Sequence, residues 1–269
     1  MSAKLKVATR YLFREQLKYL GLVYFYVIAS LAVIPFLFAL FTGTLNHLSF
    51  GHLFVFNFSF IFGLFAFIWM TFSYDNFKLF IQNGISRKTF WLARLLSLLM
   101  VSLIGELLAT IYYFAVSNPI QHWHFAQGFN HQFYAQLYGT HFGSGTMPNL
   151  IAGFILTWLL FVALGLSGMA LGSIFSLLTK TVRRVVLIAI PILGGFFLVF
   201  LMNVSSPGSA TDAHTKAIFE FLYWLMGGSN HDSAGSLNPI MPALTLIVIG
   251  ILMAAIAYYF NRKLKLKNA

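Results

Sequence analysis

Long runs of apolar residues, separated by short polar segments, make up most of this sequence. Six of these runs reach about 20 residues, the length that an α-helix needs to cross roughly 30 Å of hydrocarbon. The predicted spans cover residues 19–43, 50–72, 91–117, 149–178, 185–203 and 239–260. The pattern therefore predicts an all-α membrane protein whose residues 1–269 form a single transmembrane domain.

Before the first span, polar and apolar residues repeat with helical spacing. Lys6, Arg10, Arg14 and Lys18 recur every fourth residue, while a second face carries Leu5, Ala8, Leu12 and Tyr19. This spacing favours an amphipathic helix over residues 1–18 that lies in the membrane interface. The alternative is a basic anchor that simply precedes the first span.

The polar segment between the second and third spans predicts a short helix at about residues 75–86. Phe77, Phe80 and Ile81 share one face of this helix, Gly84 can end it, and Ser86 can cap the helix that follows. We expect the aromatic side chains to be exposed, and therefore to need a lipid or protein partner.

A second short apolar segment, at about residues 217–227, lies between the fifth and sixth spans. It is too short to cross a bilayer, which favours a re-entrant or interfacial helix on the outer side. A lid packed on top of the bundle is the alternative.

The distribution of charge orients these segments. Sixteen of the 17 Lys and Arg residues fall in four patches that alternate with the apolar runs, and Lys216 is the exception. The patches are Lys4–Lys18, Lys78–Arg94, Lys180–Arg184 and Arg262–Lys267. By the positive-inside rule, these patches and both termini are cytoplasmic. The net charge of +11 is thus explained by topology, and no nucleic-acid partner is expected.

Composition limits the chemistry that this chain can perform. Hydrophobic residues make up 59% of it, and it contains no cysteine, which excludes disulfides and thiol catalysis. The sequence also lacks a GxxxxGK[ST] phosphate-binding loop and an HExxH helix. All eight histidines lie in or beside the outer loops, without the pattern of a metal site. We expect neither a catalytic residue nor a bound metal or cofactor.

One acidic residue, Glu106, lies inside a predicted span. Ionisable groups at that depth usually face the bundle interior or a wet cavity, and they often mark a pathway. Tyr113 lies close to it on the same helical side, and with Glu220 in the outer segment these residues form a candidate substrate pathway. The alternative is a protonated Glu106 that bonds a neighbouring helix for packing alone.

Small residues in the fourth span predict a close helix contact. Gly165, Gly168 and Gly172 make a narrow groove, and the last two fit the small-xxx-small pattern. The contact can lie within the chain or in a dimer.

The segment Leu79-Phe-Ile-Gln-Asn-Gly-Ile-Ser-Arg-Lys-Thr-Phe-Trp-Leu-Ala-Arg-Leu-Leu96 resembles a motif of ABC-2 type transporter permeases, of the form l-l-x-x-G-x-S-R-x-x-f-x-x-x-K-l-l. The overall topology is also similar to that family, although Arg94 stands where the family often has Lys. The resemblance implies that residues 75–86 are the coupling helix, which sits in a groove of a separate ATPase. Its coupling residues would be Phe77, Phe80, Ile81, Gly84, Ser86 and Arg87.

The same resemblance implies the partners. ATP and magnesium would be bound by the partner ATPase, and a second permease copy or a paralogue would complete the pathway. We expect a bacterial plasma membrane protein that exports an amphipathic or lipid-like substrate, such as an antimicrobial peptide. Two other classes remain open, namely an intramembrane enzyme using Glu106 and a substrate-binding membrane subunit of an importer.

Overall fold

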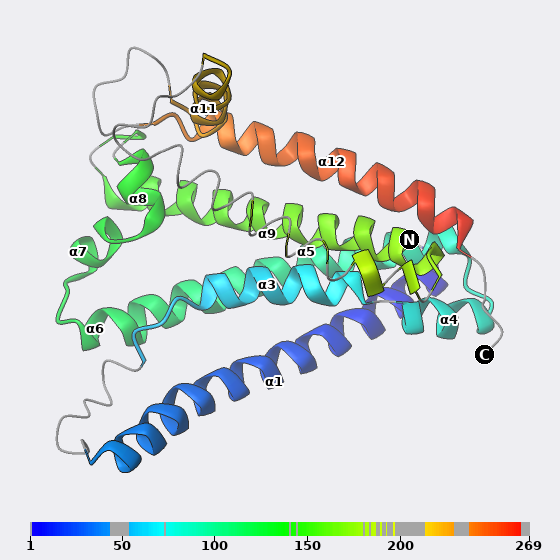
Figure 1. Ribbon diagram of the computed structural model, residues 1–269, viewed down its shortest axis with the longest axis horizontal. Coiled ribbons are helices and arrows are strands. Elements are labelled where there is room, and N and C mark those ends of the chain that lie inside the picture. The colour runs from blue at the N-terminus through cyan, green and yellow to red at the C-terminus, as the bar shows by residue number, and fades with distance from the viewer. Residues whose placement is uncertain are drawn as a thin grey trace.

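The computed structural model describes residues 2–43, 54–72, 74–139, 141–143, 145–179, 213–228 and 237–264, with isolated residues between 181 and 196. Its elements are α1 (Ala3–Thr42), α3 (Phe58–Thr71), α4 (Tyr74–Gln82), α5 (Arg87–Tyr112), the π-helix η2 (Tyr113–Ser117), α6 (Asn118–Ile120), α7 (Phe125–Asn130), α8 (Phe133–Tyr138), α9 (Thr146–Leu177), α11 (Ala213–Leu225) and α12 (Ile240–Lys263) (Figure 1). No strand occurs among the described residues, so the predicted all-α class is confirmed for them.

Four helical stretches in this part of the chain are long and apolar enough to cross a membrane. They are α1, the run Arg87–Ile120 formed by α5, η2 and α6, then α9 and α12. Together, α3 and α4 form a fifth candidate that bends by 47° between the two helices. Most of the predicted span 185–203 lies outside the described residues, as does the start of the span at 50–72.

Helix α1 runs across the predicted boundary at residue 18. It runs without a break for 40 residues, or about 60 Å, and Ser2 caps its start by accepting a hydrogen bond from the Leu5 amide. Its buried face continues from Leu12 through Gln16 to Leu20, directly across the expected boundary. One contact face thus serves both halves, so residues 1–18 belong to the same continuous helix as the first span, and their place in the membrane interface stays a prediction.

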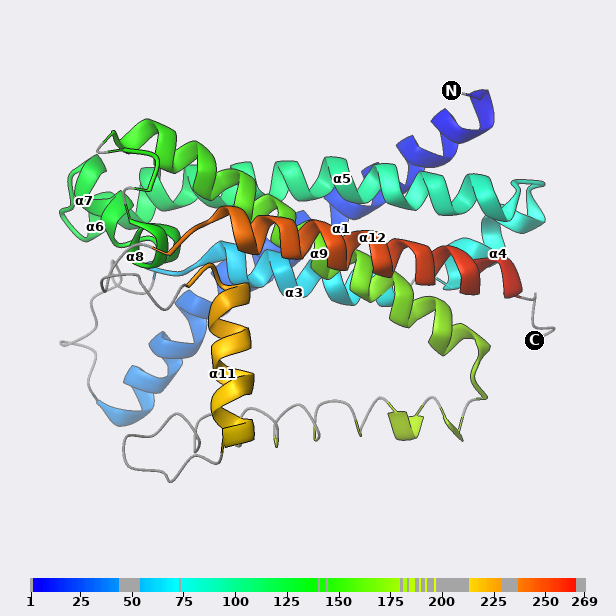
Figure 2. The same cartoon turned by 90° about the horizontal axis from the view of Figure 1, so that it is seen from above.

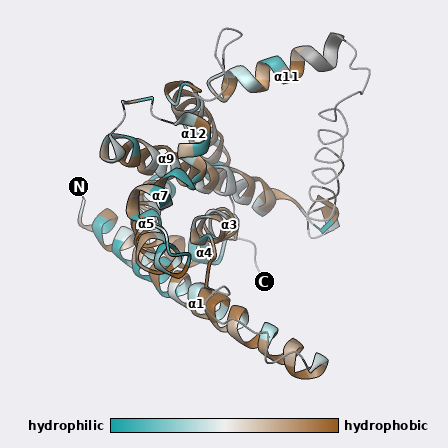
Figure 3. Ribbon diagram, turned by 90° about the vertical axis from the view of Figure 1, so that its left-hand side faces the viewer, coloured by the Kyte–Doolittle hydropathy of each residue, from teal (hydrophilic) through white to brown (hydrophobic). Residues whose placement is uncertain are grey.

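The bundle is organised around α9, which packs against α3 on one side and α12 on the other, while α1 packs along α5. Figure 3 shows this arrangement end-on. A β-carbon at Gly168 or Gly172 would collide with the backbone carbonyl of Phe67 or Thr71 on α3, and one at Gly165 would collide with Leu98 of α5. The glycines therefore permit close contacts between helices of this same chain.

The described ends of the chain lie at one end of the bundle, beside α4 (Figure 1). Ala8 of α1 and Leu264, which follows α12, belong to one buried cluster with Phe77 and Phe80. At the opposite end, α8 packs its buried Tyr134 and Tyr138 among residues of α9.

Helix α11 projects from the N-terminal end of α12 (Figure 2). It ends at the predicted glycine pair, where Gly227 adopts φ +93° and the Gly228 amide donates to the Tyr223 carbonyl over 2.9 Å. Phe221 and Trp224 remain about half exposed, at 56% and 49%. Among the described residues, α11 is therefore not a lid that buries its apolar side chains on the bundle, and re-entry into a membrane stays a prediction.

Candidate functional site

Helix α4 is a short helix whose C-terminal end is fixed by its own sequence. Gly84 adopts φ +71°, the Gly84 amide donates to the Ile81 carbonyl over 3.1 Å, and the Ile85 amide donates to the Phe80 carbonyl over 3.0 Å. These paired bonds are a Schellman motif, which satisfies carbonyls that the helix end leaves open. Ser86 then accepts a hydrogen bond from the Thr89 amide over 3.1 Å and so caps α5. The predicted helix stop and cap are both confirmed.

The aromatic face of α4 points into the protein, contrary to the sequence-based expectation. Phe77 is 1% exposed and Phe80 is 6% exposed, and both rings lie 5.6 Å from the Phe90 ring of α5. Leu12 of α1 and Leu264 complete the cluster, with Ile81 partly buried against it. Since these side chains already fill a core, Phe77 and Phe80 hold α4 in place and do not form an exposed docking surface.

Helix α1 contacts α4 along one side through three side chains. The Asn76 amide donates to a Glu15 carboxylate oxygen over 2.9 Å, and the Tyr11 ring meets the Phe80 ring edge-on at 5.5 Å. The Lys4 ammonium also donates to the Gly84 carbonyl over 3.3 Å. These contacts, together with the Phe77 cluster, fix the direction in which the other face of α4 points.

That other face is exposed and mostly polar. It carries Asp75, Leu79 and Gln82, of which Leu79 is 41% exposed. Arg87 is exposed too, but its guanidinium donates to the Arg262 carbonyl of α12 over 2.6 Å. We call Asp75, Leu79 and Gln82 the outer face of α4.

Arg94 is the most deeply buried cation among the described residues, at 3% exposed. Its guanidinium donates to the Met70 carbonyl over 2.6 Å and lies 5.6 Å from the centre of the Phe90 ring. Met70 is in the last turn of α3, where carbonyls lack partners within the helix and carry partial negative charge. Arg94 therefore caps α3 at the bend into α4. The sequence analysis placed it in a basic patch that sets the topology and missed this role.

A polar strip follows the buried side of α5 into the bundle. Ser97 donates to Gln16 of α1 over 2.6 Å, and Ser102 accepts from the Trp158 indole of α9 over 3.1 Å. Both bonds join α5 to a neighbouring span. The strip ends at Glu106, which is 5% exposed.

Glu106 is bonded on one oxygen only within the described part of the chain. Thr110 donates to Oε1 over 3.3 Å, whereas Oε2 has no hydrogen-bond partner there. The Tyr24 hydroxyl of α1, also buried and unbonded there, lies within electrostatic range of this carboxyl. An incompletely satisfied carboxyl between α1 and α5 can accept a hydrogen bond from a ligand or a proton from a donor.

The structure does not gather the three predicted pathway residues into one site. Tyr113 begins the π-helix at the C-terminal end of α5, and its hydroxyl donates to the Gly128 carbonyl of α7 over 2.8 Å. Glu220 is exposed on α11, which projects away from the bundle that contains Glu106 (Figure 2). Of the three residues, Glu106 is the one that is buried inside the bundle, and the substrate pathway stays a prediction.

The segments that connect α6, α7 and α8 hold aromatic and imidazole side chains in packing contacts. Trp123 stacks on His131 at 4.0 Å between ring centres. Among the described residues, no group of three His, Cys, Asp or Glu side chains is placed to hold a metal ion.

Together, the spanning helices define a multi-pass α-helical membrane protein. Comparison with protein-family models, with curated proteins and with solved structures finds no significant match. The resemblance to ABC-2 permeases therefore rests on the motif in residues 79–96 and on the order of the segments.

Proposed function

We propose that this chain is the membrane-spanning subunit of an ATP-driven transporter, and that a separate ATPase binds the outer face of α4. The observation that carries this proposal is the construction of α4. Phe77 and Phe80 anchor one face in a core, so Asp75, Leu79 and Gln82 point outward from the bundle. A rigidly held short helix with one exposed side can transmit movement to α5 and α1, since it packs on both.

In this proposal the end of the bundle with α4 and the described termini is cytoplasmic, and the membrane is the bacterial plasma membrane. The basic patches at that end support this orientation. ATP and magnesium are bound by the ATPase. Six spans form half of a pathway that a second copy or a paralogue completes, and α11 is a re-entrant helix on the outer side.

The cargo that suits this proposal is amphipathic or lipid-like. Glu106 supplies a polar point among the apolar side chains between α1 and α5. A molecule with an apolar body and a hydrogen-bond donor can use both surfaces. We propose outward transport, which vesicles test directly, since export predicts accumulation of a labelled amphipathic peptide inside inverted vesicles supplied with ATP.

The role of the outer face of α4 is tested by purifying the full chain from its native membrane and measuring the ATP hydrolysis that copurifies with it. Leu79→Asp places a charge on the outer face and is expected to reduce this activity about tenfold or more, as at an interface hot spot. Leu177→Asp is the matched control, because Leu177 is 37% exposed at the same end of the bundle but belongs to α9.

Two results would contradict the proposal. ATP hydrolysis absent from the purified wild-type chain excludes a stable ATPase partner. Equal activity in the Leu79→Asp and wild-type proteins shows that the outer face of α4 is not the surface that binds it.

A further inference from the structure

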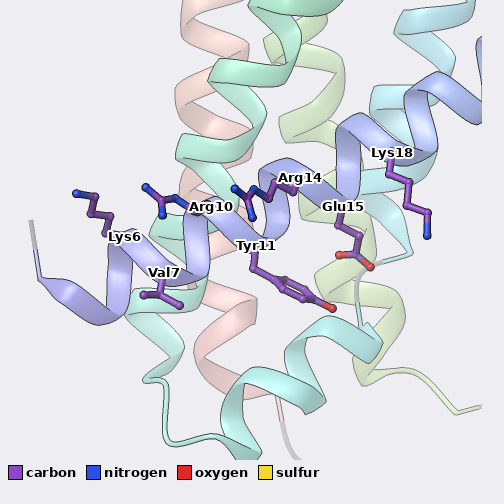
Figure 4. A pocket seen from close by; sticks show the side chains of 7 residues that line it. All are labelled: Lys6, Val7, Arg10, Tyr11, Arg14, Glu15 and Lys18. Carbon is purple, nitrogen blue, oxygen red and sulfur yellow. The ribbon is translucent and has the colours of Figure 1, made fainter.

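The first half of α1 exposes a row of cations that the packing of the helix does not use. Lys6, Arg10, Arg14 and Lys18 are all exposed and follow one another about 6 Å apart along the axis (Figure 4). The opposite face of the same turns is buried against α4 and α5. The row therefore faces away from the bundle.

These cations line an open, shallow groove of about 520 Å³ along the surface of α1, together with Val7, Tyr11 and Glu15 of the same helix. Val7 is 67% exposed and Tyr11 is 44% exposed, so the groove has an apolar floor beside its charges. Glu15, the one carboxylate in the lining, accepts its hydrogen bond from Asn76 of α4. The groove thus combines excess positive charge with apolar surface, which suits an amphiphilic anion.

The continuity of α1 indicates where that anion comes from. One turn after Lys18, the same exposed side carries Leu22 and then Tyr26, which are 40% and 66% exposed. In a spanning helix, such exposed apolar side chains face hydrocarbon. Because α1 has no break here, the cations begin one turn beyond this surface, at the level where lipid phosphates lie.

We propose that this groove binds the headgroup of an anionic phospholipid. Arg10 and Arg14 contact the phosphate, because planar guanidinium groups can donate two parallel hydrogen bonds to it. Lys18 and then Leu22 follow one turn apart on the hydrocarbon side of Arg14, so the glycerol lies beside Lys18 and the first carbons of the acyl chains lie beside Leu22. The site needs no ATPase, and its test is independent of the transport proposal.

The test uses the full chain reconstituted in nanodiscs of three parts phosphatidylcholine to one part phosphatidylglycerol, then transferred to neutral detergent. Mass spectrometry of the retained lipid measures the preference. The wild type is expected to retain phosphatidylglycerol in preference to phosphatidylcholine. Arg10→Gln with Arg14→Gln is expected to weaken phosphatidylglycerol binding at least tenfold, since each cation near an anionic surface contributes about fivefold.

Two further variants make the result specific to this groove. Arg10→Lys with Arg14→Lys keeps the charge and is expected to retain most of the preference. Lys78→Gln with Lys88→Gln removes the same charge from α4 and α5 at the same end and is expected to change it less than about twofold. The melting temperature in lipid-free detergent separates lost binding from lost folding, and exposed substitutions leave it nearly unchanged.

The proposal is overturned if the Arg10→Gln, Arg14→Gln protein retains as much phosphatidylglycerol as the wild type. It is also overturned if the lysine control loses as much, because the preference then follows total charge. Displacement by excess inorganic phosphate identifies a free-phosphate site, and displacement by a soluble acidic polypeptide identifies a protein-docking surface. Either displacement excludes the lipid.

Discussion

The Phe77→Ala variant distinguishes between the two orientations of α4 that the sequence allows, in which its aromatic face is either buried or exposed. In the structure the Phe77 ring is 1% exposed and lies within 6 Å of the rings of Tyr74 and Phe90. Phe77→Ala leaves a cavity in this cluster, and such truncations cost about 3 kcal/mol or more in protein cores. An exposed Phe77 waiting for a partner would cost the isolated chain almost nothing.

This loss of stability should appear as local opening of α4. Nine residues are too few to keep a helix without tertiary contacts, so α4 depends on its cluster. A loss of about 3 kcal/mol raises the population of the open state about 100-fold. Hydrogen exchange measured by mass spectrometry in a peptide covering residues 74–86 reports that change, while peptides from α9 should exchange at the wild-type rate.

Two comparison variants test how the increase in exchange depends on the volume removed and on the burial of the side chain. Phe77→Leu keeps most of the volume and is expected to raise exchange less than about tenfold. Leu79→Ala shortens an exposed side chain on the same helix and is expected to change exchange less than about threefold. Equal exchange in the Phe77→Ala and Leu79→Ala proteins would refute the inward orientation of the aromatic face.

Three further predictions concern the bundle itself and are checked by thermal melting of the purified chain in detergent. Arg94→Ala removes the guanidinium that donates to the Met70 carbonyl and is expected to cost about 1–3 kcal/mol, so an unchanged melting temperature would show that Arg94 does not stabilise the end of α3. Gly168→Ala forces α9 away from an α3 backbone carbonyl and should lower the melting temperature, whereas Gly21→Ala, which meets open space in α1, should leave it equal or raise it. Glu106→Gln keeps the shape of the side chain and removes its charge, so the melting temperature should not fall; a clear decrease would reveal a cation that pairs with the carboxylate.

Four of the six predicted spans, 19–43, 91–117, 149–178 and 239–260, correspond to helices that are long and apolar enough to cross a membrane, because each of these apolar runs is long enough to require a helix in a bilayer. The sequence predicts the unbroken α1 less well, since the change from basic to apolar residues at Lys18 looks like a boundary. Gln16 was the residue that could have indicated a contact face continuing across Lys18. It stands on the same helical side as Leu12 and Leu20, and a glutamine at such a position is expected to find a polar partner in a neighbouring element. The structure supplies Ser97 of α5 as that partner.

The sequence could not show which way the aromatic face of α4 points, for a different reason. Helical spacing shows that Phe77 and Phe80 lie on one side of a helix, but not which way that side points. Both possible partners, a core formed by α1 and α5 or another protein, are apolar. Only the path of the chain decides between them, because the turn at Gly84 returns it along α5 and brings Phe90 against both rings.

Arg94 shows that a count of Lys and Arg residues indicates the orientation of the chain but not what each side chain contacts. The positive-inside argument treated it as one of 16 cytoplasmic cations, yet its side chain is buried between α3 and α5. Its position between Phe90 and Leu98, at helical spacing, already places it on the buried side of α5. A cation there must have an acceptor, and the end of α3 provides one in the Met70 carbonyl. Leaving Arg94 out still gives 15 of 17 cations in the basic patches (16 − 1 = 15), so the inferred orientation does not depend on it.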